Sequence, residues 1–165
     1  MALPRPSMQS EALNADYRDL LVALVKHEVE FLIVGAWALA AHGYPRATVD
    51  FDVLVRPSHT NAARVVAALR EFGAPLAAHG VEEDDFTRPG NIYQIGQPPR
   101  RIDILTAISG VTFQEAWTTR HLQQLGGLSV AFLGLEALIR NKRAAGRPKD
   151  LADVARLVAR PPNPE

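Results

Sequence analysis

Residues 48–56 alternate apolar and polar side chains, which is the pattern of a strand buried on one face. The apolar face would carry Val49, Phe51, Val53 and Val55, and the opposite face Thr48, Asp50, Asp52 and Leu54. Residues 11–27 and 61–72 instead repeat apolar side chains every three or four positions, which predicts amphipathic helices. The chain therefore mixes strand and helix patterns.

Shorter patterns extend this interpretation to the other segments. Strands are predicted over 31–34, 91–95, 101–105 and 128–133, and helices over 36–41, 112–119, 134–145 and 149–159. Residues 73–90 are predicted to form a loop with room for a short strand near Leu76. This mixture predicts an α/β (α+β) fold, a mixed β-sheet flanked by helices. We expect one domain over 11–159, a disordered N-terminus at 1–10 and a flexible tail at 160–165.

The composition is that of a soluble globular domain, with 47% apolar and 22% charged residues among 165. The sequence contains no cysteine, which excludes disulfides, cysteine-bound zinc and a thiol nucleophile. No apolar run approaches the ~20 residues of a membrane span, and the start of the sequence lacks the apolar core of a signal peptide. We therefore expect a cytoplasmic protein with no membrane partner.

The net charge of zero hides an asymmetry along the chain. Residues 1–99 carry four more acidic than basic side chains, and residues 100–165 carry four more basic than acidic ones. A neutral total argues against binding nucleic acid through bulk charge. The segregation must therefore be explained by local features.

Two aspartates, Asp50 and Asp52, lie two residues apart on the polar face of the 48–56 strand. Carboxylates whose bases are ~6–7 Å apart repel each other unless a cation lies between them. Mg²⁺ (or Mn²⁺) is a suitable cation, since it prefers carboxylate and phosphate oxygens. If the strand containing Asp103 is adjacent, three carboxylates converge on a site suited to phosphoryl transfer. The simpler alternative is that each aspartate is a solvated strand or turn residue.

A strand-to-helix turn precedes these aspartates. The strand over 31–34 runs into Gly35 and Ala36 and then directly into a helix, whose first backbone N–H groups are free to face an anion. Small residues at such a turn allow a phosphate to approach the backbone. An ordinary turn is the alternative, but its position one short helix before Asp50 favours phosphate binding.

Together these features resemble the nucleotidyltransferase superfamily that includes DNA polymerase beta. The family pattern is an apolar residue, Gly, then Gly or Ser, a short spacer, Asp-x-Asp, and a third carboxylate on a later strand. The matching residues are Val34, Gly35, Ala36, Asp50, Asp52 and Asp103. The resemblance implies a nucleotidyltransferase fold with C-terminal helices, in which the three aspartates are catalytic and bind metal. Ala36 departs from the pattern because alanine lacks both the flexibility of glycine and the hydroxyl of serine.

The closing helices, 134–145 and 149–159, carry a second pattern. Lys142 continues the apolar stripe of its helix, so it either extends past the edge of the core or reaches a charged site. Asp150 and Asp153 begin the next helix, where capping and dipole compensation are the ordinary explanation. The stretch resembles small nucleotidyltransferases of the abortive-infection and toxin–antitoxin type. The matching residues are Lys142, Arg147, Lys149, Asp150 and Asp153, with Gly43, Arg46 and Thr48 upstream.

The resemblance implies a metal-dependent enzyme that moves a nucleoside monophosphate from an NTP to a hydroxyl of an acceptor. The acceptor could be RNA such as tRNA, a protein or a small molecule, and an antitoxin partner or a homodimer could complete the site. The implied nucleotide-binding residues are Gly35, Ala36, Arg46, Thr48, Lys142, Arg147, Lys149 and Asp150. The alternative is a catalytically degenerate module of the same fold that binds nucleotide or a partner.

Overall fold

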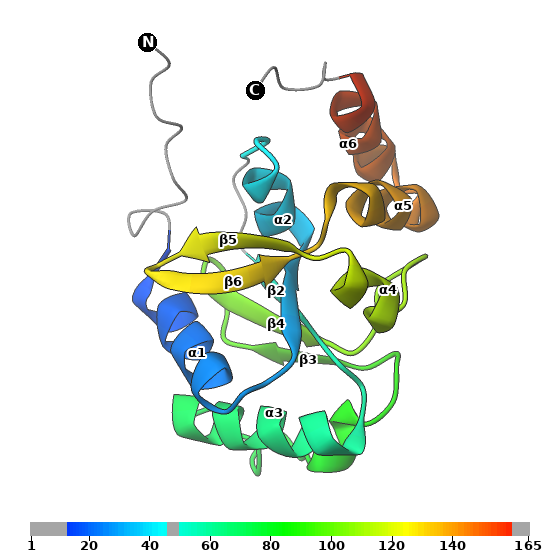
Figure 1. Cartoon of the computed structure of the whole chain (residues 1–165). Coiled ribbons are helices and arrows are strands. Elements are labelled where there is room, and N and C mark those ends of the chain that lie inside the picture. The colour runs from blue at the N-terminus through cyan, green and yellow to red at the C-terminus, as the bar shows by residue number, and fades with distance from the viewer. Residues whose placement is uncertain (1–12, 46–49, 160–165) are drawn as a thin grey trace.

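A mixed β-sheet forms the centre of the computed structural model, which describes residues 13–45 and 50–159 (Figure 1). The sheet of these described residues has the strand order β3-β4-β2-β1-β6-β5. The strands are β1 (Phe31–Val34), β2 (Asp50–Val55), β3 (Ile92–Ile95), β4 (Arg101–Leu105), β5 (His121–Leu125) and β6 (Leu128–Phe132). The pairs β2–β4 and β1–β6 are parallel, and the other pairs are antiparallel. The predicted mixed sheet is therefore confirmed.

Helices cover both faces of this sheet. They are α1 (Ala15–Lys26), α2 (Gly35–Ala41), α3 (His59–Phe72), α4 (Phe113–Thr118), α5 (Leu135–Ala145) and α6 (Pro148–Ala159), with a 3₁₀ helix, η1, at Glu83–Phe86. The apolar residues of α1 and α3 pack with one face of the sheet, and those of α4, α5 and α6 pack in a second cluster on the other (Figure 1). Within the described ranges, no helix is long and apolar enough to cross a membrane.

Local sequence signals set the helix boundaries. The side chain of Asn14 accepts a hydrogen bond from the backbone N–H of Tyr17 at the start of α1, and Ser58 caps α3 in the same way. Gly73 and Gly146, both with left-handed backbone, end α3 and α5. As a result α1 begins at Ala15, later than predicted, and α3 begins two residues earlier than predicted.

The sequence prediction missed one strand, and a second strand that it left open as an alternative does not form. Residues 121–125 form β5, which was not predicted, because only Leu122 and Leu125 of its five residues are apolar and they do not alternate. Within the described residues, β5 is an edge strand of the sheet. No strand forms near Leu76 within the described loop; its side chain is buried, but the surrounding backbone forms turns before η1. The start predicted for β2, at Thr48, lies outside the described residues.

Candidate carboxylate site on two parallel strands

The site begins with the register between β2 and β4. Asp50 lies directly opposite Arg101, and Asp52 lies directly opposite Asp103. Because side chains two residues apart on a strand share a face, all four project from the same side of the sheet. The structure thus brings together the three aspartates named from the sequence, and it adds an arginine to them. Asp103 is the most buried of the three, with 8% of its surface exposed.

Arg101 connects two of the three carboxylates. Its Nη2 donates a hydrogen bond to Oδ2 of Asp50 at 2.9 Å, and its Nε lies 3.4 Å from Oδ1 of Asp103. Sequence reasoning missed this residue, although a signal was present. Arg101 precedes Asp103 by two positions in an alternating strand, so it had to share the face of that aspartate.

The protonation of Asp52 and Asp103 is coupled because the two face each other. Burial raises the pKa of Asp52 to about 7, with further contributions from the charges of Asp103 and Asp50 and a hydrogen bond with Asp103. Burial also raises the pKa of Asp103, although the positive charge of Arg101 opposes that rise. Near neutral pH the Asp52–Asp103 pair therefore holds a proton part of the time.

Gly35 lies directly beside the side chain of Asp52. Val34 is the register partner of Asp52 on β1, so the residue after it lies beside the carboxylate. Gly35 has a φ of 68°, and a Cβ added to it would lie 2.3 Å from Oδ2 of Asp52. Glycine is favoured at this position by the backbone conformation, and any Cβ there would force the Asp52 carboxylate to move. Ala36, the next residue, is half-buried in the first turn of α2.

Tyr17 of α1 supports the site from the other face of the sheet. Its ring stacks on Phe51 with 4.6 Å between centroids, and its hydroxyl donates to the backbone carbonyls of Arg101 (3.2 Å) and Pro99 (3.4 Å). Burial raises the pKa of Tyr17, and the charges of nearby Asp50 and Asp52 add to this. No sequence signal pointed to this contact, because it joins segments far apart in the chain.

The donor chemistry of the site suits a divalent cation. All three acidic groups are carboxylates, and Oδ1 of Asp103 is buried without a hydrogen-bond partner. The side chains would nevertheless have to move to bind an ion. Among the described residues, no three His, Cys, Asp or Glu side chains lie close enough together to coordinate one metal. The guanidinium of Arg101 contacts two of the three carboxylates that would have to approach a metal.

The predicted basic residues belong to a different part of the molecule. Lys142 is buried between α5 and α6, where Nζ lies 2.9 Å from Oδ2 of Asp153 and 3.4 Å from Oδ1 of Asp150. Arg147 holds the same Asp150 with Nε 2.6 Å from Oδ2. Burial alone would raise the pKa of Asp150, but Arg147 and Lys142 together lower it. Lys142 continues the apolar stripe of α5 and therefore points inward, where it forms ion pairs with Asp150 and Asp153.

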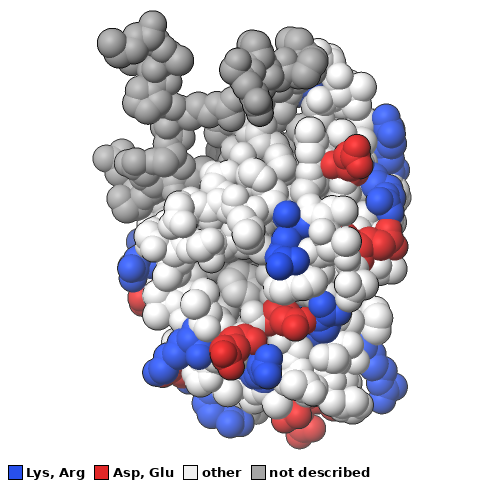
Figure 2. All heavy atoms as spheres, in the orientation of Figure 1, with Lys and Arg blue, Asp and Glu red and all other residues white. Residues whose placement is uncertain are grey.

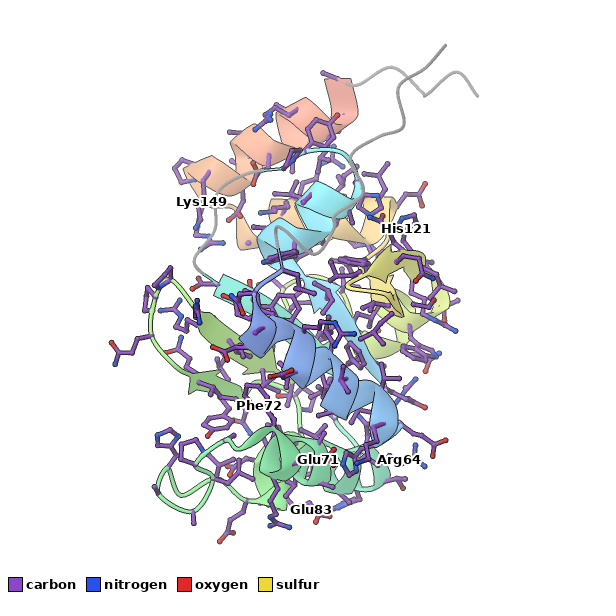
Figure 3. All side chains as sticks on the ribbon, turned by 90° about the vertical axis from the view of Figure 1, so that its left-hand side faces the viewer. Arg64, Glu71, Phe72, Glu83, His121 and Lys149 are labelled. Atoms are coloured by element: carbon purple, nitrogen blue, oxygen red, sulfur yellow. The ribbon has the colours of Figure 1, made fainter. Side chains whose placement is uncertain are left out.

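The remaining residues predicted to bind nucleotide are Lys149, Arg46 and Thr48. Lys149 is exposed at the start of α6, at the opposite end of the molecule from Arg64 and Glu71 on α3 (Figure 3). Arg46 and Thr48 lie outside the described residues. The nucleotide-binding role of all these residues stays a prediction.

Comparison with known proteins finds a match in structure but none in sequence. No protein-family model and no curated protein matches the sequence. A crystal structure described as that of "a putative nucleotidyltransferase" from Thermotoga maritima superposes with a TM-score of 0.61 at 13% sequence identity. The match covers 94% of this chain and 98% of the other. The chain therefore has a nucleotidyltransferase-like fold.

Proposed function

We propose that this protein is a metal-dependent nucleotidyltransferase. The observation that carries the proposal is the grouping of Asp50, Asp52 and Asp103 on neighbouring parallel strands, directly beside the Gly35 turn. A solvated or structural role does not require three buried or half-buried carboxylates to be held against one another, since their repulsion costs free energy. The fold shared with the bacterial structure supports the same function.

The three aspartates would hold Mg²⁺ or Mn²⁺, which when bound supplies charge to neutralise the phosphates. An acceptor hydroxyl would attack the α-phosphorus of an NTP, forming a new P–O bond while the bond to the β-phosphate breaks and pyrophosphate leaves. Asp103 would take the proton of that hydroxyl. Its raised pKa, like that of the neighbouring Asp52, suits a base that must work near neutral pH.

The nucleotide would lie along the turn at Gly35 and Ala36, with Arg46 and Thr48 nearby in the chain. Lys149, which is exposed, and Arg147, whose side chain is 61% exposed, could reach phosphates from the start of α6. Lys142 is already engaged with Asp150 and Asp153, so its contribution would come through the placement of α6. RNA, protein or a small molecule would serve as acceptor, and an antitoxin or a second copy of the chain would be the partner.

A labelled-nucleotide assay tests the proposal. Purified protein is incubated with each α-³²P-NTP and Mg²⁺ or Mn²⁺, together with total RNA, total protein or a set of hydroxyl-bearing small molecules. We expect transfer of the α-label. We expect Asp52→Asn to reduce it at least about 100-fold, because even a residue that only orients a metal ligand is worth about 10–100-fold. Asp19→Asn, an exposed aspartate on α1, is the matched control and should retain full activity.

A second candidate function is favoured by two residues. Ala36 stands where the family pattern has Gly or Ser, and Arg101 already neutralises part of the acidic site. Both fit a module that binds nucleotide without transferring it. Tight NTP binding that survives Asp52→Asn, with no label transferred under any condition, would establish this module and exclude the enzyme.

A further inference from the structure

Four charged side chains project from the same face of the sheet: Asp50 and Asp52 from β2, and Arg101 and Asp103 from β4. Opposite charges face each other in the Asp50–Arg101 pair, and like charges face each other in the Asp52–Asp103 pair. Like charges directly opposite in a sheet are destabilising, and opposite charges are stabilising. The arginine therefore offsets part of the repulsion that the three aspartates create.

Arg101 also contacts carboxylate oxygens that a bound cation would use. It occupies Oδ2 of Asp50 through a hydrogen bond of 2.9 Å, and it lies 3.4 Å from Oδ1 of Asp103. These are oxygens that a cation between the strands would need. An oxygen that accepts a hydrogen bond from guanidinium cannot offer the same lone pair to a metal.

The two contacts differ in strength. The contact with Asp50 is a charge-assisted hydrogen bond, whereas Oδ1 of Asp103 has no hydrogen-bond partner and faces the Nε only at ion-pair distance. The Arg101 side chain is 30% exposed although its Nε is buried, and the backbone pairing of β4 with β2 and β3 does not depend on the position of the guanidinium. The arginine is thus attached to the site but not locked in it.

We propose that Arg101 is a positioning residue that acts as a tethered counter-cation: it holds Asp50 and Asp103 in the metal-free protein and sets the affinity for a divalent cation by competing with it. The proposal rests on the proposed function, because it assumes that the aspartates bind metal. A purely structural Arg101 would stabilise the sheet equally with and without metal, and its loss would leave the affinity unchanged.

Metal binding is measured directly by calorimetric titration of Mn²⁺ into the metal-free full-length protein. A pH of about 8.5 keeps proton competition small at carboxylates with raised pKa. We expect Arg101→Gln to bind Mn²⁺ about tenfold more tightly than the wild type, since it removes the competing charge. Arg101→Lys keeps the charge but not the two-sided geometry and should lie between the two.

Arg100→Gln is the matched control. It removes the same charge one residue away, where Arg100 pairs with Asp16 of the chain at 3.8 Å on the surface. Because exposed charges are screened by salt, its affinity for Mn²⁺ should stay within about twofold of the wild type. An equal gain in Arg100→Gln would mean that net charge, not the contact, sets the affinity, and would overturn the proposal.

The outcomes separate this proposal from the proposed function. Wild-type binding that is lost in Asp52→Asn but unchanged or weakened in Arg101→Gln overturns the role of Arg101 and leaves the metal site standing. Absence of Mn²⁺ binding in the wild type and in both Arg101 variants overturns both. If Arg101→Gln does not fold, Arg101→Lys decides, because affinity no tighter than the wild type contradicts competition.

Discussion

Gly35 shows how a single residue without a side chain shapes the candidate site. Its left-handed backbone turns the chain from β1 into α2, and its missing Cβ leaves room for the carboxylate of Asp52. The half-buried Asp52 is thereby held between Gly35 on one side and Asp103 on the other. The glycine therefore has a steric role at the carboxylates as well as the predicted role at the phosphates.

Replacing Gly35 by alanine tests the steric role. The Asp52 carboxylate must turn away from the new Cβ, so we expect Mn²⁺ affinity and label transfer to fall at least about tenfold. The free energy of unfolding should fall by about 1 kcal/mol from the backbone conformation alone. Urea unfolding and calorimetric titration measure the two effects.

Gly80→Ala is the control for that comparison. Gly80 has nearly the same φ, 65°, but a Cβ there would meet nothing within 4 Å. Its free energy of unfolding should fall by a similar ~1 kcal/mol with metal binding intact. Loss of metal binding in both variants would trace the effect to general destabilisation.

At this scale the sequence identified the acidic residues but not their neighbours. Asp50 and Asp52 stand out because alternation is a local pattern, readable over a few positions. Alternation also places Arg101 on the face of Asp103, but its contact with Asp50 depends on the pairing of β4 with β2, and pairing between distant segments leaves no local signature. The contact of Tyr17 with the backbone of Arg101 is hidden for the same reason.

Among the elements, the pairing of α5 with α6 depends on buried charge. Lys142, Asp150 and Asp153 are each at most 8% exposed, and Arg147 covers the group from outside. Removing one member of such a group leaves the remaining buried charges less well compensated, which is costly. The order of charges in the two helices thus serves their packing in this structure.

We expect Lys142→Met to lower the free energy of unfolding by about 3 kcal/mol, because Asp153 loses its lysine in a buried setting. Arg143→Met, the exposed neighbour on α5, should change it by less than about 0.5 kcal/mol. Chemical denaturation followed by circular dichroism measures both. Unchanged stability together with weaker NTP binding in Lys142→Met would instead support the phosphate contact predicted from the sequence.

The ends of α3 and α5 were predictable from the glycines that follow them, whereas the predicted starts of α1 and α3 missed the capping residues Asn14 and Ser58. The prediction failed at β5, where His121 to Leu125 includes three polar side chains and lies at an edge of the sheet. An edge strand exposes one side to water, so its composition is close to that of a loop. Its pairing with β6 is what makes it a strand, and that pairing is a tertiary fact.

At the scale of the whole molecule, ion pairs join the acidic half of the sequence to its basic half. Acidic and basic side chains lie beside one another on the face shown in Figure 2. Arg101, from the basic half, pairs with Asp50 from the acidic half, and Arg100 pairs with Asp16 in the same way. The fold thus brings the two halves together, and part of the asymmetry reflects such pairing.

The raised pKa of Asp52 predicts how stability depends on pH. Between about pH 4 and pH 7 the folded state binds more protons than the unfolded state, so the free energy of unfolding falls as pH rises. Comparison of the wild type with Asp52→Asn in EDTA isolates this effect. The variant should gain roughly 2–4 kcal/mol relative to the wild type from pH 4 to pH 8.

Urea unfolding at several pH values measures that difference. Saturating Mn²⁺ should remove most of the wild-type loss at pH 8, because a bound cation favours the ionised carboxylates. A difference between the two proteins that does not change with pH would contradict the raised pKa and the close approach of Asp52 to Asp103.

The overall class, a mixed sheet with helices on both faces, was predictable because it depends on the sum of many local patterns. The strand order and the β2–β4 register were not, since both depend on which buried faces fit together in three dimensions. The candidate site was therefore predictable as a set of three aspartates, and its arrangement became visible only in the structure.

The parallel pairing of β2 with β4 also bears on how the chain folds. Residues that face each other across this pair, such as Asp50 and Arg101, are 51 positions apart, so a long loop must close before they meet. Helices α1 and α3 can begin from local contacts, whereas this pairing cannot. We infer that an incompletely folded chain carries three ordinary, hydrated carboxylates, and that the site comes into existence only with the closing of the sheet around it.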